Sequence, residues 1–295
     1  MPSLKDVKMK IVGVGKTKQI TKAMNMVASA KLRGAQARIE AFRPYAAKYH
    51  DVLAELSTKV EGNAHPLLAE HEEKKNCAII LITSDRGLCG SFNGNIIAKG
   101  LSLAKEKTNA GMTVKFSCVG RKGRDAVRQA GYEIITAFAD RMGSIDFSLA
   151  STVAQELIHG YEELNLDEVW LIHGEFISMA QQPPKTLCLL PLKTPQADEN
   201  AAPAEKGAHC EYIYEPQEEK LLATLLPRYV NVQVYSGLLD TSASEHAARM
   251  AAMDNATRNC NEMINSLTLL YNKTRQASIT SELIDIVGGA EALNG

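Results

Sequence analysis

The chain has 295 residues, of which 45% are apolar, 23% charged and 5% aromatic. These values are ordinary for a globular protein, and the length suggests about two domains. With 33 basic against 34 acidic side chains, the net charge is -1, which disfavours a dedicated nucleic-acid-binding protein. No run approaches the roughly 20 apolar residues that span a bilayer, so we expect no integral membrane segment.

The six cysteines are spread along the chain without a CxxC pair, and the seven histidines are equally dispersed. Such spacing argues against a zinc site or a redox motif. The first residues lack the apolar core of a secretion signal. We therefore expect an intracellular chain with reduced cysteines, no metal and no cofactor.

The first segment, residues 3–56, is predicted to form a long helix, because it contains a single proline and heptad-spaced apolar residues. These residues fall into two runs with a shift of phase between them. They are Leu4, Val7, Ile11 and Val14, followed by Ile20, Met24 and Val27. Frequent alanines would let a partner helix approach closely.

The middle of the chain changes to the pattern of an α/β domain. Short apolar runs at 77–83, 113–119, 168–173 and 186–190 are typical of buried strands. Helical stretches at 91–107, 121–130 and 144–164 alternate with them. This alternation predicts a largely parallel sheet. The acidic, Pro- and Ala-containing segment 194–208 is expected to be a mobile loop.

From Glu218 the helical period returns and predicts a second long helix, ending at Gly288-Gly289. One stripe steps by three and four residues over its whole length. Its members are Ala243, Ala247, Met250, Met253, Thr257, Cys260, Ile264, Leu267, Tyr271 and Thr274. Residues 243–287 alone would measure about 68 Å. Because an α/β domain of this size cannot bury such a helix, the N-terminal helix is the expected partner.

The predicted fold class is therefore α/β with a long α-helical coiled coil. The N- and C-terminal helices form the antiparallel coiled coil, and a Rossmann-like α/β domain is inserted between them. We expect the boundaries to be 1–60 for the first helix, 75–215 for the inserted domain and 216–295 for the second helix.

Gly13-Val-Gly-Lys-Thr17 resembles the end of a phosphate-binding P-loop, which makes a nucleotide-binding protein the alternative function. The full pattern requires a glycine where this chain has Lys10. It also requires a strand before the loop, whereas the flanking heptads favour helix. The sequence therefore disfavours this alternative.

Ser84-Asp-Arg-Gly-Leu-Cys-Gly-Ser-Phe-Asn93 follows the first predicted strand, where doubly wound folds bind ligands. It lacks the GxGxxG spacing, and Cys89 has no local histidine that would make it a nucleophile. A tight turn with close backbone approach is the favoured interpretation.

Charge is distributed unevenly along the chain. Residues 1–38 carry nine basic side chains against one acidic, a net of +8, whereas residues 240–287 carry four basic and six acidic, a net of -2. A basic helix can bind nucleic acid, an anionic membrane or acidic protein loops, or it can be a solvated flank of the coiled coil. No aromatic residues are interleaved for base stacking, which counts against single-stranded nucleic acid.

Several long strings resemble one family, the gamma subunit of F-type ATP synthase, in its bacterial type. They lie in the expected order at residues 20–33, 84–93, 244–258, 269–284 and 286–292. Gly13, Gly15 and Gly34 depart from the residues usual in that family.

The resemblance implies a central rotor shaft that is not itself an enzyme. Such a shaft couples proton flow through the c ring to sequential conformational changes in the catalytic beta subunits, for ATP synthesis or hydrolysis. The implied partners are the alpha, beta, epsilon and c subunits, with no nucleic acid and no substrate of its own. The implied location is peripheral, on the cytoplasmic face of the bacterial inner membrane.

The resemblance also assigns site residues. Contacts with beta subunits are implied for Lys22, Met24, Arg275, Gln276 and Thr280. An apolar bearing at the tip is implied for Ile279, Leu283, Ile284, Ile286 and Val287. Contacts with epsilon and the c ring are implied for Tyr212, Tyr214 and Glu215.

Overall fold

The computed structural model describes residues 3–59, 65–69, 71, 74–163, 165–192 and 218–294. The chain divides into two compact units. The first, which we call the terminal pair, comprises Met1–Ser29 and Arg249–Gly295. The second, which we call the α/β unit, comprises Ala30–Ala248. The expected loop at 194–208 lies outside the described residues.

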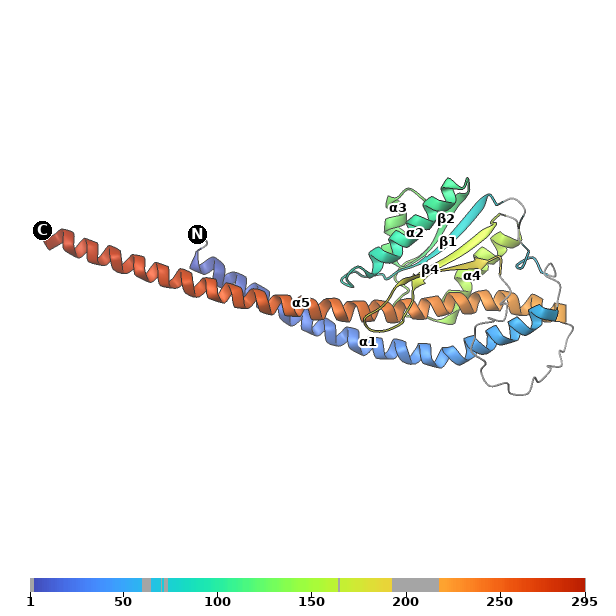
Figure 1. Ribbon diagram of the computed structural model, residues 1–295, viewed down its shortest axis with the longest axis horizontal. Helices are drawn as coiled ribbons and strands as arrows, with labels where there is room; N and C mark the ends of the chain where they lie inside the picture. Colours follow the sequence, from blue (N-terminus) through green and yellow to red (C-terminus); the bar gives the residue numbers. More distant parts are fainter. Residues whose placement is uncertain are drawn as a thin grey trace. The chain divides into compact units, whose positions relative to one another are not determined.

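Two long helices contribute to both units (Figure 1). Helix α1 spans Leu4–Lys59 and α5 spans Glu218–Asn294, and each contains an internal proline. Helix α5 continues through Gly288 and Gly289, so the predicted end at these glycines is wrong. Each glycine costs a helix about 1 kcal/mol relative to alanine, which is too little to stop a helix that is already propagating.

The α/β unit contains a five-stranded sheet in the order β3-β2-β1-β4-β5. Strands β1 to β4 are parallel, and β5 is antiparallel to β4. The bounds are Asn76–Ile82 for β1, Thr113–Val119 for β2, Glu133–Phe138 for β3, Glu168–Gly174 for β4 and Pro184–Leu190 for β5. Three shorter helices follow β1, β2 and β3, namely α2 (Phe92–Asn109), α3 (Arg121–Gln129) and α4 (Phe147–Glu162). The predicted class, α/β with two long terminal helices, is confirmed.

The sheet lies between α2 on one face and α5 on the other. An added Cβ on Gly100 of α2 would lie 2.8 Å from Leu81, and one on Gly237 of α5 would lie 3.3 Å from Leu171. Because successive strand residues point to opposite faces, Ile172 faces α2, whereas Leu171 and His173 face α5. Both helices therefore approach the sheet closely through a glycine.

The end of β4 is bonded directly to α5. The backbone N–H of Gly174 donates to the Thr241 hydroxyl at 3.2 Å, and the Ser244 hydroxyl donates to the Gly174 carbonyl at 3.3 Å. Since Gly174 lies at the last pair of the β4–β5 ladder, these bonds satisfy backbone groups that the sheet leaves open. The part of α5 that contains Thr241 and Ser244 therefore belongs to the core of the α/β unit.

Candidate functional site: the terminal pair and its apolar C-terminal segment

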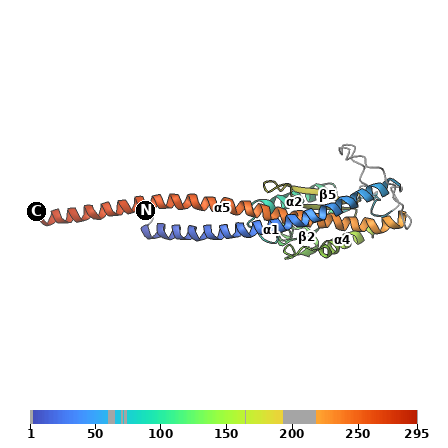
Figure 2. The ribbon, with the colours of Figure 1, turned by 90° about the horizontal axis from the view of Figure 1, so that it is seen from below.

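In the terminal pair, α1 and α5 run side by side along a single seam (Figure 2). The α5 side of the seam is the predicted stripe, since each of its members is buried or half-buried and most residues between them are exposed. On α1 the seam residues step by three and four without interruption. They are Leu4, Val7, Ile11, Val14, Lys18, Thr21, Asn25 and Ala28.

The predicted shift of phase in α1 is wrong. Ile20 and Val27 are 59% and 57% exposed, whereas Thr21 and Ala28 take the seam positions. The apolar spacing misleads here because three polar residues, Lys18, Thr21 and Asn25, occupy seam positions that apolar residues usually fill. Met24 is half-buried at the edge of the seam.

Two of these polar seam residues, Thr21 and Asn25, have specific partners on α5. The hydroxyls of Thr21 and Thr257 are 2.8 Å apart, and Nδ2 of Asn25 donates to the Met250 carbonyl at 2.8 Å. Buried polar groups with matched partners set the register of paired helices at some cost in stability. Because Thr21 meets Thr257 and the helices are antiparallel, Leu4 falls opposite Thr274.

Beyond Thr274, α5 therefore has no counterpart on α1, which begins at Leu4. Five large apolar side chains in this stretch are between 48% and 68% exposed. They are the predicted bearing residues Ile279, Leu283, Ile284, Ile286 and Val287. An exposed apolar stretch of this length indicates a surface for another protein.

The proposed beta-contact residues form two separate groups. Lys22 is exposed and Met24 half-buried beside the Thr21–Thr257 contact. Arg275, Gln276 and Thr280 are all exposed, and the Thr280 hydroxyl donates to the Gln276 carbonyl at 2.9 Å. Lys22 falls opposite residue 256, so about 28 Å of helix separates the two groups. Tyr212, Tyr214 and Glu215 lie outside the described residues.

Sequence reasoning missed a second apolar row on α1. Met9, Val12, Ile20, Met26 and Val27 are each more than half exposed. They lie off the seam, so they do not stabilise the helix pair. The signal was present in the sequence, because these residues are apolar but do not fit the register that Leu4 and Val7 begin.

The P-loop alternative does not fit the structure. Gly13 to Thr17 lie inside α1, and the described residues before them, 3–12, contain no strand. The Thr17 hydroxyl donates to the Gly13 carbonyl at 3.2 Å, as in an ordinary helix. The backbone N–H groups are committed to the helix, so they form no cradle for phosphates.

The strand-end segment 84–93 is a structural hub of the α/β unit. Asp85 accepts bonds from the backbone N–H groups of Arg121, Asp140 and Met142, at 2.8 to 3.1 Å. The Ser84 N–H donates to Oδ1 of Asn93 at 3.0 Å. These side chains fill the place where a doubly wound fold would hold a ligand, which agrees with the favoured tight-turn interpretation.

At Gly120 the backbone lies very close to the backbone of Thr83, which directly follows β1. The φ of Gly120 is +98°, and an added Cβ would lie 2.1 Å from the Thr83 carbonyl oxygen. The next helix is also held by Thr83, whose hydroxyl accepts from the Gly123 N–H at 2.8 Å. The α3 N-terminus is therefore occupied by the chain's own groups.

Comparison with known proteins identifies the family. The family model described as ATP synthase matches residues 3–293. Proteins named ATP synthase gamma chain are 64% identical in Nitratidesulfovibrio vulgaris strain Hildenborough and 59% identical in Maridesulfovibrio salexigens, over 100% of both chains in each case. The chain belongs to the ATP synthase gamma-chain family.

Solved structures agree with the gamma-chain fold. A chain of the Euglena gracilis mitochondrial ATP synthase is 20% identical with a TM-score of 0.68, covering 98% of this chain and 94% of that one. A chain from the central stalk and c ring of the Tetrahymena thermophila mitochondrial ATP synthase is 26% identical with a TM-score of 0.59, covering 80% and 99%. As a gamma chain, this protein is a non-catalytic subunit of a membrane-associated complex. No helix in the described residues is long and apolar enough to cross a membrane.

Proposed function

We propose that this gamma chain is the central rotor shaft of its ATP synthase. In this role it couples ion flow through the c ring to sequential conformational changes in the catalytic beta subunits. The observation that carries the proposal is the apolar end of α5, which extends beyond the start of α1 with its large side chains exposed. A stiff helix pair with an unpartnered apolar tip suits a shaft that turns inside a ring of other subunits.

We assign to the site residues the roles that the family resemblance implies. The bearing is the five-residue tip of α5, and the beta contacts are Lys22 and Met24 on α1 and the polar group Arg275, Gln276 and Thr280 on α5. All of these side chains are exposed except Met24, which is half-buried, and this exposure supports the assignment. The contacts with epsilon and the c ring are assigned to Tyr212, Tyr214 and Glu215. The assembly would then hold this chain on the cytoplasmic face of the membrane.

We also propose that the functional parts follow the boundaries 1–60, 75–215 and 216–295. Under this division the first and last parts transmit torque, and the inserted part meets epsilon and the c ring. The +8 segment of residues 1–38 would face acidic loops of beta subunits.

Co-expression with alpha and beta subunits of the same source tests the shaft role. The gamma chain should co-purify in a stoichiometric complex that hydrolyses ATP, whereas the isolated chain should bind no ATP. Isolation of a stoichiometric complex of this chain that lacks alpha and beta would contradict the proposal.

The assigned polar contact can be tested in the same complex. Arg275→Ala should lower ATP turnover about tenfold, the loss expected for a charge-assisted hydrogen bond worth about 1.5 kcal/mol. Lys273→Ala is the matched control, because Lys273 is an exposed cation two residues away. Equal activities of the two variants would refute the assignment of Arg275.

A further inference from the structure

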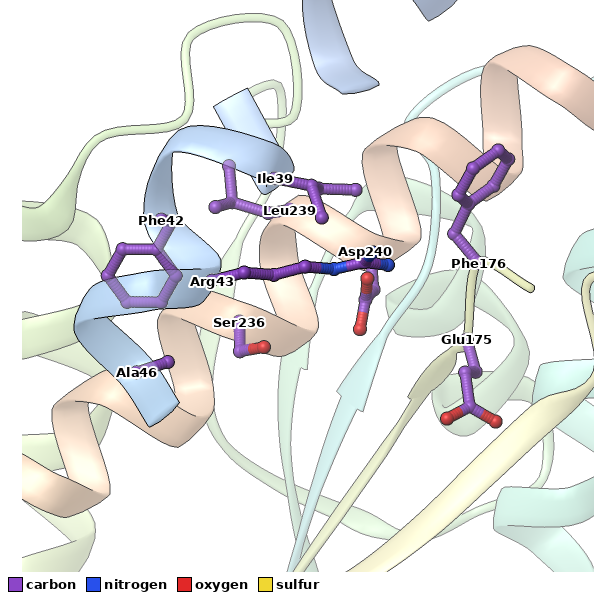
Figure 3. Close-up of a pocket in the computed structure, with 9 residues that line it drawn as sticks. All are labelled: Ile39, Phe42, Arg43, Ala46, Glu175, Phe176, Ser236, Leu239 and Asp240. Carbon is purple, nitrogen blue, oxygen red and sulfur yellow. The ribbon is translucent and has the colours of Figure 1, made fainter. Parts of the chain in front are cut away.

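The α/β unit contains a polar cavity where α1, α5 and the end of β4 meet (Figure 3). Its volume is about 150 Å³, which is room for a few water molecules. Helix α1 contributes Ile39, Phe42, Arg43 and Ala46, helix α5 contributes Ser236, Leu239 and Asp240, and the segment after β4 contributes Glu175 and Phe176. Five of these nine side chains are apolar, one carries a hydroxyl and three are charged.

Two of these charges have no direct partner in the described part of the chain. Neither Arg43 of α1 nor Asp240 of α5 makes a hydrogen bond or an ion pair with a described residue. Glu175, by contrast, pairs with Lys185 of β5 at 2.5 Å. Figure 3 shows the Arg43 side chain extending across the cavity toward Asp240. Arg43 is exposed and Asp240 is half-buried, so solvent can reach this separated pair through the cavity.

Asp240 is the group in this cluster whose charge changes near neutral pH. Burial raises the pKa of its carboxyl to about 6, and the Glu175 carboxylate adds to the rise, whereas the Lys185 and Arg43 cations oppose it. His173, on the β4 face toward α5, has a pKa lowered by burial to about 4 and stays neutral over the same range.

The raised pKa of Asp240 decides how the stability of the cavity changes with pH. The folded-state pKa of Asp240 lies above its unfolded value, so the ionised carboxylate destabilises the closed cavity at pH 7. That penalty is removed as the pH falls through about 6. Opening of the cavity to water removes the same penalty without a proton.

We propose that this cavity is a proton-operated joint between the two long helices and the β4–β5 turn. With Asp240 ionised, the carboxylate draws water between α1 and α5 and the joint opens readily. With Asp240 protonated, the apolar walls close and the helices are held more firmly against the sheet. This role is independent of the contacts assigned to the shaft, and the proton is its ligand.

Hydrogen exchange of the purified full-length chain measures the joint directly. After correction for intrinsic exchange, amides of residues 39–46 and 236–240 should gain roughly tenfold protection between pH 7.5 and pH 5.0. That factor is the linkage expected when the carboxyl pKa is about 6 in the closed joint and near its ordinary value in the open one. Asp240→Asn should be protected at both pH values and show no pH dependence.

Asp254→Asn serves as the matched control, because Asp254 is an exposed carboxylate on α5 paired with Arg258. It should retain the pH dependence of the parent chain. If Asp240→Asn fails to fold, carbon-13 NMR of labelled aspartate carboxyls supplies the test in other variants. The Asp240 midpoint should rise in Arg43→Gln and fall in Glu175→Gln.

The proposal is overturned if Asp240 titrates near pH 4 in the parent chain. Protection that does not change between pH 7.5 and pH 5.0 also overturns it, as does an unchanged pH dependence in Asp240→Asn. An Asp240 midpoint near 6 that moves in the two expected directions supports it.

Discussion

The α/β unit and the terminal pair bury apolar residues to very different extents. In β1, six of seven residues are buried, and the side chains of Ile79 and Phe116 are completely enclosed. In the terminal pair, every α5 seam residue from Thr257 to Thr274 stays half-exposed, and the α5 tip is exposed altogether. The α/β unit therefore encloses its own apolar core, whereas the terminal pair leaves apolar surface for other subunits. Four variants test this difference in burial, with effects on stability that decrease from the first to the last.

The largest effect is expected for Gly120→Ala in the α/β unit. The new Cβ would lie 2.1 Å from the Thr83 carbonyl oxygen and the backbone would keep a φ of +98°, so we expect a loss of at least about 3 kcal/mol. Urea unfolding followed by circular dichroism measures it. Gly111→Ala is the control, because its φ is +87° with open space around it. Equal losses of unfolding free energy in the two variants would show that the close approach of Gly120 to the Thr83 carbonyl oxygen contributes nothing to the loss.

Asn25→Ala tests the polar seam of the terminal pair. Removal of the bond to the Met250 carbonyl should cost about 1 kcal/mol, because one seam contact is lost and the carbonyl is left half-buried. The measurement is the opening free energy of amides near Asn25 by hydrogen exchange. Asn272→Ala, at an exposed α5 position, should cost nothing. An equal loss of opening free energy in both variants would show that the bond between Asn25 and the Met250 carbonyl does not stabilise the seam.

Gly15→Ala should stabilise the terminal pair by about 1 kcal/mol. An added Cβ at Gly15 meets no atom within 4 Å, so the gain in helix propensity is not offset by a clash. Hydrogen exchange of α1 measures the gain, and Gly13→Ala should behave alike for the same reason. Destabilisation by either variant would show that a phosphate loop or another non-helical state exists there.

Leu283→Asp should have almost no effect on the isolated chain, because Leu283 is 57% exposed. In the assembled complex it should strongly reduce the yield of coupled enzyme, since a charge would enter an apolar surface. Thermal unfolding of the chain and purification of the complex give the two readouts. Leu283→Met keeps the apolar surface and should assemble normally. A normal yield of coupled complex with Leu283→Asp would refute the assignment of Leu283 to an apolar bearing.

The sequence predicted most of the α/β unit because its strands are continuous apolar runs. It missed β3, whose residues Glu133–Phe138 alternate between exposed and half-buried at the edge of the sheet. This alternation differs from the continuous apolar run of a central strand, and from residues 186–190 of β5 at the other edge, which are mainly apolar. The stripe of α5 was predicted correctly because it is long and periodic.

The sequence alone does not show which face of α1 packs on α5, and therefore not which α1 residues remain exposed. Seam and outer face both carry apolar residues, and it is the contacts of Thr21 and Asn25 and the burial of Val7 and Ala28 in the folded chain that show which face is which. The cavity at Asp240 was likewise beyond sequence reasoning, since Arg43 and Asp240 are almost 200 positions apart and meet only through the fold.

Observation of rotation tests the shaft role most directly. A bead would be attached through biotin at position 105, where Lys105 is exposed on α2, and the alpha–beta ring would be fixed to a surface. We predict that ATP drives rotation of the bead in one direction, in step with ATP turnover. ATP turnover at the normal rate with a stationary bead in intact complexes would contradict it.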